Sequence, residues 1–418
     1  MNKINITNIE YYSNIIIIAC MIPMSYFAPI GEWLLISILA IISLFKYIYK
    51  PIKINFSNIF LFIIISLIFY FSYIFSINNT RSLEVLGPNL GIIFSVFVIL
   101  ILTSNNKIKK LEKFIGISIL ITSFIIICDL TIQTEIKTNL ASLVGDNPSS
   151  ESANFSRGIL ILTMLMPIVT SILFNKKKYL YGSILLFIIS IIILIGPNHT
   201  AKIALICSLI AAITIYIFGP RSFIFFGLVS GLIILFIPLI SLKIFPSIGK
   251  YEKSIEYKNR SGDKSFRRMA WQETSTGGSV IHRLLVWEFA GKEILKKPLF
   301  GHGIGTSRLI GQNIILNIPN TNSEIKGGIP LHPHNNFIEI WLELGIIGIT
   351  IISFIWFKII KYGYYLRKQS FILGTGACTS IVAMFIICNL SFGFFQTWWM
   401  SSLGLIFLII QQTCSHEG

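Results

Sequence analysis

The chain has 418 residues, of which 54% are hydrophobic and only 12% are charged, and its formal net charge is +16. Its mean hydropathy of +0.76 lies outside the range of soluble globular domains. This composition excludes a water-soluble enzyme and predicts an all-α, polytopic integral membrane protein.

Apolar runs long enough to cross a bilayer follow one another along the chain, since a helical span needs about 20 apolar residues. The first run lacks a small-residue cleavage site, so we expect no cleavable signal peptide. About twelve transmembrane helices are predicted in this way. Their approximate residues are 11–28, 33–49, 57–76, 88–104, 114–132, 158–174, 179–196, 202–219, 223–243, 337–358, 371–390 and 396–412.

Basic residues concentrate in every second connection between these spans, whereas the opposite connections carry few. By the positive-inside rule, the basic side is cytoplasmic. The pattern predicts a bacterial inner-membrane protein with both termini in the cytoplasm, and it explains much of the positive charge without a nucleic-acid partner. The basic group includes Lys46, Lys50, Lys53, Lys107, Lys109, Lys110, Lys113, Lys176, Lys177, Lys178, Arg221, Lys358, Lys361, Arg367 and Lys368.

Cysteine placement argues against an extracytoplasmic disulfide framework. Five cysteines fall within predicted spans, and Cys414 follows the last one. Because no Cys/His spacing typical of zinc ligation is present either, we expect no metal site.

One long polar stretch divides the chain into three regions. Residues 1–243 hold the first nine spans, residues 244–336 form a large periplasmic loop, and residues 337–418 hold the last three spans and a short cytoplasmic tail. Long loops of this kind usually carry function. Inside the loop, an amphipathic helix that ends before Pro298 is predicted from a stripe formed by Leu284, Trp287, Ala290 and Ile294. A glycine-rich turn (301–308) and an irregular polar segment to about Gly328 are expected to follow.

The loop returns to the membrane through a histidine-rich segment. Prolines on either side of His332 keep the approach extended. His334 then lies near the start of the next helix, which either Asn335 or Asn336 can cap. Polar groups at a membrane boundary are costly unless they face a hydrated, protein-lined cavity, so this segment predicts a functional site.

Histidines and cations on the outer side favour transfer from a phosphate-linked donor. Cations can neutralise a diphosphate leaving group, and a neutral histidine can accept the proton of an attacking hydroxyl. The candidate cations are Arg157, Lys202, Arg283 and Arg308, and the outer histidines are His199, His282, His302, His332 and His334. Anchoring at the membrane interface would explain Arg308, His282 and His302 as well. Glu343 fits either a buried partner for a cation or simple helix polarity.

The segment HNNFIEIWLELGIIGIT resembles the signature of the O-antigen ligase family: His, then Asn, Ser or Gln, nine residues, Gly, two residues and Gly. His334, Asn335, Gly345 and Gly348 occupy its fixed positions. Upstream, HRLLVWEFAGKEILKKPLFGHGIGTSR resembles the loop segment of the family. NFSRG (154–158) and AKIAL (201–205) resemble segments that recur at the starts of its spans.

This resemblance implies a metal-independent glycosyltransferase with a GT-C-like membrane fold and no cofactor. Its donor would be a glycan on undecaprenyl diphosphate, its acceptor a sugar hydroxyl of lipid A–core, and membrane lipid would surround it. His334 matches the general base of the family and Arg283 its diphosphate-binding arginine. Lys202 stands where many members carry a second arginine, and lysine lacks the planar bidentate grip of arginine. Further substrate contacts are expected from Arg157, His332, Arg308 and Asn335.

Three alternatives stay open. A polymerase of O-antigen or another surface polysaccharide and a protein O-oligosaccharyltransferase would use the same chemistry with another acceptor. A twelve-helix transporter is disfavoured, because such folds usually divide around a central cytoplasmic loop. Here the middle connection, 175–178, is very short, and the long loop is off-centre.

Overall fold

The computed structural model describes residues 6–49, 56–102, 111–132, 136, 151–243, 275–317, 324–329 and 331–414. Each expected span coincides with a helix in these ranges. The helices are α1 (Ile6–Phe27), α2 (Glu32–Tyr49), α3 (Phe56–Ile74), α4 (Asn79–Leu102), α5 (Leu111–Thr131), α7 (Glu151–Asn175), α8 (Tyr179–Ile195), α9 (His199–Phe218), α10 (Pro220–Lys243), α14 (Asn336–Gln369), α15 (Phe371–Leu390) and α16 (Thr397–Cys414).

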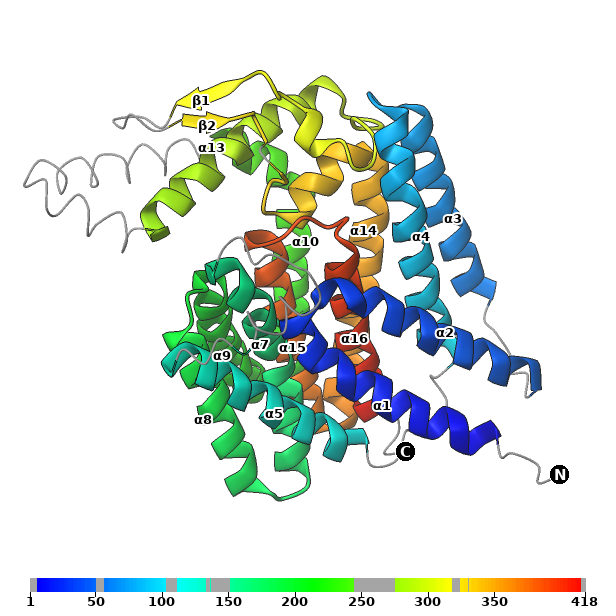
Figure 1. Cartoon of the computed structure of the whole chain (residues 1–418), viewed down its shortest axis with the longest axis vertical. Helices are drawn as coiled ribbons and strands as arrows, with labels where there is room; N and C mark the ends of the chain where they lie inside the picture. Colours follow the sequence, from blue (N-terminus) through cyan, green and yellow to red (C-terminus); the bar gives the residue numbers. More distant parts are fainter. Residues whose placement is uncertain are drawn as a thin grey trace, which may run out of the picture.

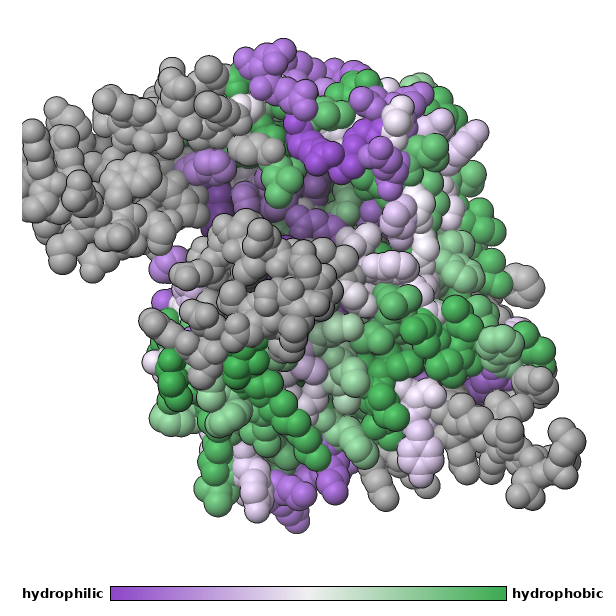
Figure 2. All heavy atoms as spheres, viewed as in Figure 1, coloured by the Kyte–Doolittle hydropathy of each residue, from purple (hydrophilic) through white to green (hydrophobic). Residues whose placement is uncertain are grey.

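The apolar helices identify a membrane protein. Among the described residues, α4, α5, α7, α9, α10, α14 and α15 are long and apolar enough to cross a bilayer, and α1, α3 and α8 contain shorter apolar segments. Large apolar side chains such as Phe225 (69% exposed) point outward from these helices. Hydrophobic residues therefore cover the flanks of the bundle, as lipid contact requires (Figure 2). The number of crossings and their orientation stay predictions.

Helices α7 and α15 form the centre of the bundle. In their apolar segments 83% and 78% of the residues are buried, against 28% in α9 and α10. Helix α15 packs against α7, α9 and α14, and α14 packs against α10. A Cβ atom at Gly376 would lie 2.2 Å from the Ser171 hydroxyl oxygen, so the glycine allows α15 to approach α7 closely.

The loop region lies at one end of the bundle, where hydrophilic residues gather (Figures 1 and 2). Its helix α13 (Ser275–Lys296) packs against α10 and α14. The amphipathic stripe is confirmed, because Leu284, Trp287, Ala290 and Ile294 are all buried. Lys296, at the end of the helix, is exposed.

Two expectations about this half of the chain were wrong. Helix α14 does not end near residue 358 but continues to Gln369, and only Ser370 separates it from α15, so the basic residues there lie on the helix and not in a connection. The segment before Gly328 is not irregular throughout. It contains an antiparallel hairpin of β1 (Ile315–Asn317) and β2 (Glu324–Lys326), closed by a hydrogen bond from Gly328 N to Gly311 O. Residues 244–274 of the expected loop and 415–418 of the expected tail lie outside the described residues.

Candidate active site

His334 is held in one orientation at the entrance to α14. Its Nδ1 lies 3.0 Å from the carbonyl oxygen of Ser391. Because a carbonyl only accepts hydrogen bonds, the ring proton must be on Nδ1, which leaves the Nε2 lone pair free. The side chain of Asn335 caps α14 by accepting from Phe337 N and Ile338 N, so Asn335 and not Asn336 is the capping residue.

The backbone of His334 adopts an unusual conformation. Its φ of +54° lies in the left-handed region, which residues other than glycine adopt at a cost of about 1–3 kcal/mol. The preceding carbonyl, that of Pro333, accepts a hydrogen bond of 2.5 Å from the indole nitrogen of Trp287. The hydrogen bonds around His334 therefore stabilise a backbone conformation that is unfavourable for a histidine, and they fix the position of its imidazole.

Arg283 reaches the same place from α13. It lies one helical turn before Trp287, so the bond from Trp287 to Pro333 ties the part of α13 that carries Arg283 to the segment that carries His334. The ring centroid of His334 lies 4.3 Å from that of His332 and 6.4 Å from that of His282. The structure thus brings together three histidines and one arginine from two separate segments of the loop region.

These neighbours keep the imidazoles neutral. Burial, followed by the charge of Arg283 and by His282, lowers the pKa of His334 to about 4, against the opposing effect of the Ser391 carbonyl. Burial, His334 and Arg283 lower the pKa of His332 to about 3. Burial and Arg283 also lower the pKa of His282. At neutral pH the cluster therefore combines uncharged bases with a fixed cation.

Lys202 lies in the first turn of α9, beside His199. That helix begins at His199, and its capping residue Asn198 accepts a hydrogen bond of 2.9 Å from Ala201 N. Lys202 and Arg283 both lie close enough to His199 to interact with it electrostatically. His199 is thus the imidazole on which both cations act, whereas the groups that act on His334 are Arg283 and His282.

Arg157 and Arg308 occupy other surroundings. The guanidinium carbon of Arg157, on α7, lies 4.9 Å from the ring centroid of Trp398, and its charge acts on Glu32. Arg308 is exposed on the short helix η2 (Ser307–Leu309). The charged and titratable groups that act on His334 are instead Arg283 and His282.

The glycine-rich turn fills a break in α14. Gly345 has non-helical dihedral angles, which frees the carbonyls of Leu342 and Glu343 from the helical ladder. They accept from His302 N (2.8 Å) and Gly303 N (3.0 Å) instead. The turn and the signature motif are therefore bonded backbone to backbone.

Buried carboxylates on α14 were missed as site-forming residues, or left open, in the sequence analysis. Glu343 accepts hydrogen bonds from Gly305 N, Ser307 N and the Ser307 hydroxyl at 2.5, 2.9 and 2.6 Å. Its partners are thus mainly groups of the glycine-rich turn. One turn earlier, Glu339 accepts from Phe394 N in the connection between α15 and α16. The available sequence signal was two glutamates spaced one helical turn apart in an otherwise apolar helix.

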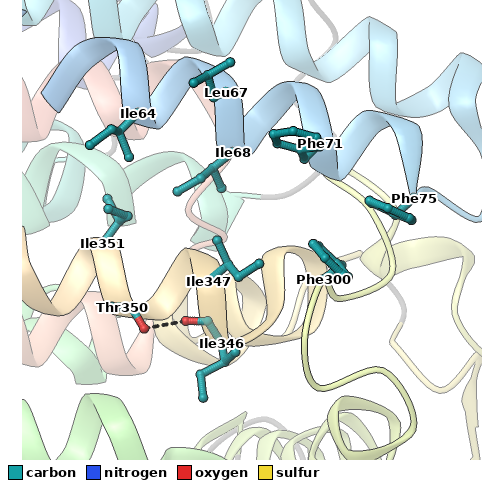
Figure 3. Close-up of a pocket in the computed structure, with 10 residues that line it drawn as sticks. All are labelled: Ile64, Leu67, Ile68, Phe71, Phe75, Phe300, Ile346, Ile347, Thr350 and Ile351. Carbon is teal, nitrogen blue, oxygen red and sulfur yellow. Dashed lines mark hydrogen bonds between the residues drawn. The ribbon is translucent and has the colours of Figure 1, made fainter. Parts of the chain in front are cut away.

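An apolar groove adjoins the glycine-rich turn. It has a volume of about 760 Å³ and runs between α3 and α14, lined by Ile64, Leu67, Ile68, Phe71, Phe75, Phe300, Ile346, Ile347, Thr350 and Ile351 (Figure 3). Its one hydroxyl, that of Thr350, is bonded to the Ile346 carbonyl. Such a lining suits a hydrocarbon chain and offers no group for acid–base chemistry.

Part of this chain is similar to known proteins. Residues 184–353 match the family model described as O-Antigen ligase. A candidate polysaccharide ligase of Rickettsia felis is 34% identical over 146 residues, which are 35% of this chain and 35% of that protein. Another, of Rickettsia typhi, is 26% identical over 264 residues, or 61% of this chain and 57% of the relative. The matched parts cover less than two thirds of either relative, and no solved structure matches the chain.

The matched residues include both loop segments that carry the candidate site, the one with Arg283 and the one with His334. Lys202, Arg283 and His334 all fall inside residues 184–353, as does the glycine-rich turn, whereas Arg157 lies before them. The resemblance first seen in the His-Asn signature is therefore confirmed over residues 184–353, which are similar to the O-antigen ligase family.

Proposed function

We propose that the protein is an O-antigen ligase that transfers a glycan from undecaprenyl diphosphate to a sugar hydroxyl of lipid A–core at the periplasmic face of the inner membrane. The observation that carries the proposal is the pairing of His334, with Nε2 unprotonated, and the half-buried cation Arg283. The similarity of residues 184–353 to the O-antigen ligase family supports glycosyl transfer from a lipid-linked polysaccharide.

In the proposed reaction, Nε2 of His334 accepts the proton of the acceptor hydroxyl. At the same time, the oxygen of that hydroxyl forms a bond to the anomeric carbon of the glycan. The bond from that carbon to the diphosphate oxygen breaks, and its electron pair leaves with the diphosphate. Arg283 and Lys202 offset the negative charge that develops there. The leaving diphosphate does not have to be protonated, because the two cations stabilise its negative charge.

The apolar groove between α3 and α14 supports a donor with a hydrocarbon chain. Its walls are isoleucine, leucine and phenylalanine side chains (Figure 3), and Phe75 stacks on Phe300 with ring centroids 4.4 Å apart. Polyprenyl chains have the same apolar character, so they could lie in such a groove without desolvating polar groups.

Reconstitution tests this function. Proteoliposomes that contain the protein, a lipid-linked glycan and lipid A–core should yield conjugated lipopolysaccharide, and His334→Ala should abolish the product. His416→Ala, in the predicted cytoplasmic tail, is the matched control and should leave the yield unchanged. Near-normal activity of His334→Ala would remove this residue as the base.

Expression in deficient strains separates the acceptor classes. Restored capping of lipid A–core in a ligase-deficient strain, seen on lipopolysaccharide gels, supports the ligase. A restored ladder of glycan lengths in a polymerase-deficient strain would identify a polymerase instead, and glycosylated protein would identify an O-oligosaccharyltransferase.

A further inference from the structure

The connection between α15 and α16, residues 391–396, forms one wall of the candidate site. Its Ser391 carbonyl accepts the hydrogen bond from His334 Nδ1. At the end of α15, the Asn389 carbonyl accepts a bond of 3.0 Å from the Asn335 amide. The position of this connection therefore determines where the Nε2 lone pair of His334 points.

Glu339, on α14, binds the same connection through its side chain. The side chain is 5% exposed, and its carboxylate faces the backbone N–H groups of Phe394 and Phe395. A Cβ atom at Gly393 would lie 2.8 Å from Glu339 Oε1 and 3.0 Å from the Cβ of His332. Carboxylate and connection are thus packed without space for an added methyl group.

A carboxylate suits this place for a chemical reason. It offers two acceptor oxygens to two neighbouring N–H donors, whereas an amide offers one oxygen and turns its NH₂ group toward a donor. A buried carboxylate is costly unless such bonds compensate it. Glutamine at this position would therefore turn its NH₂ group toward one of the two N–H donors.

We propose that Glu339 is a positioning residue for His334: by binding the backbone of residues 394 and 395, it fixes the Ser391 carbonyl that orients the imidazole. The inference rests on the proposed role of His334 as the base. Glu343, one turn further along α14, binds the glycine-rich turn in a similar way, and no hydrogen bond among the described residues joins it to Ser391 or to residues 394 and 395, so it provides a matched comparison.

The test is the pH dependence of His334 acylation by diethyl pyrocarbonate, followed by mass spectrometry of the full-length protein. This reagent acylates the neutral imidazole directly. The extent of labelling therefore reports the protonation state of His334 without any glycan substrate. The other charged or titratable groups that face His334, namely Arg283 and His282 on α13 and the preceding His332, are kept in every variant. The Ser391 carbonyl raises the basicity of His334, so its displacement lowers the midpoint of labelling.

Glu339→Gln is expected to shift this midpoint downward by about half a pH unit or more and to lower kcat about tenfold or more, with KM for the donor nearly unchanged. Glu343→Gln should keep the wild-type midpoint. If Glu339→Gln cannot be purified folded, Gly393→Ala, which pushes the same connection away from the carboxylate, should produce the shift. A wild-type midpoint in the folded Glu339→Gln protein, or in Gly393→Ala, overturns the proposal, as does an equal shift in Glu343→Gln.

Failure of the proposed function would look different. In that case the wild-type protein forms no conjugate in proteoliposomes, while the labelling comparison still decides whether Glu339 positions His334.

Discussion

Acidification tests the role of His334 directly, because a general base works only while it is unprotonated. The ordinary imidazole pKa is about 6.5, so at pH 5.5 only about 10% of such a base would be neutral. The pKa of His334 is lowered to about 4 by burial, Arg283 and His282, in that order. At pH 5.5 roughly 97% of His334 is then still neutral. The rate of transfer is expected to change little between pH 7.5 and pH 5.5 and to fall to half near pH 4.

The assay is the initial rate of conjugate formation in proteoliposomes at donor and acceptor concentrations well below KM, so that kcat/KM reports the pKa of the unliganded protein across this pH range. Return of each sample to pH 7.5 checks that the protein has not been inactivated irreversibly. Arg283→Ala should move the half-activity pH upward, because the arginine is one cause of the lowered pKa. A roughly tenfold loss between pH 7.5 and pH 5.5, with a midpoint near 6.5, would refute the reasoning.

Further substitutions test the surroundings of the base. If the guanidinium contacts the diphosphate, Arg283→Ala should lower kcat/KM by an amount that corresponds to about 2–4 kcal/mol of transition-state stabilisation, and Arg283→Lys should lower it less. Equal kcat/KM values for the wild-type protein and Arg283→Ala would exclude that contact. Lys202→Arg should keep or raise activity, and a severe loss would mean that Lys202 has another role. Trp287→Phe removes the donor to the buried Pro333 carbonyl at a cost of about 1–3 kcal/mol, which should appear as a lower unfolding temperature and a lower kcat; unchanged values would make the bond irrelevant. A chelator in the proteoliposome assay should leave the rate intact, and a loss restored by a divalent cation would contradict a metal-independent reaction.

Local sequence patterns predicted the elements that depend on neighbouring residues. Apolar runs located every expected helix to within a few residues at most ends, because burial in lipid selects long apolar segments. The stripe from Leu284 to Ile294 predicted the buried face of α13, since helical periodicity fixes which side chains share a face. The length of α14 was underestimated, because its last turns carry basic residues that resemble a connection.

The geometry of the site depended on contacts between distant residues and on backbone groups, which leave no signal in side-chain type. Ser391 acts through its carbonyl, and any residue could provide one. Glu343 binds a turn 36 or more residues before it in the chain. Charge alone could not distinguish Arg283, which acts on His334, from Arg157, which lies over Trp398; only the family resemblance singled out Arg283.

The close contact between Gly301 and Gly345 limits where the length of this segment can change in related proteins. A Cβ atom at Gly301 would lie 2.4 Å from the Glu343 carbonyl carbon, and one at Gly345 would lie 2.4 Å from the Leu299 oxygen. Both glycines also have positive φ, so neither position can gain a side chain without separating turn from helix. Between these two fixed points, the hairpin beyond Gly311 is closed on itself. Natural insertions and deletions should therefore accumulate at that hairpin, where a change in chain length would leave the distance from Arg283 to His334 untouched.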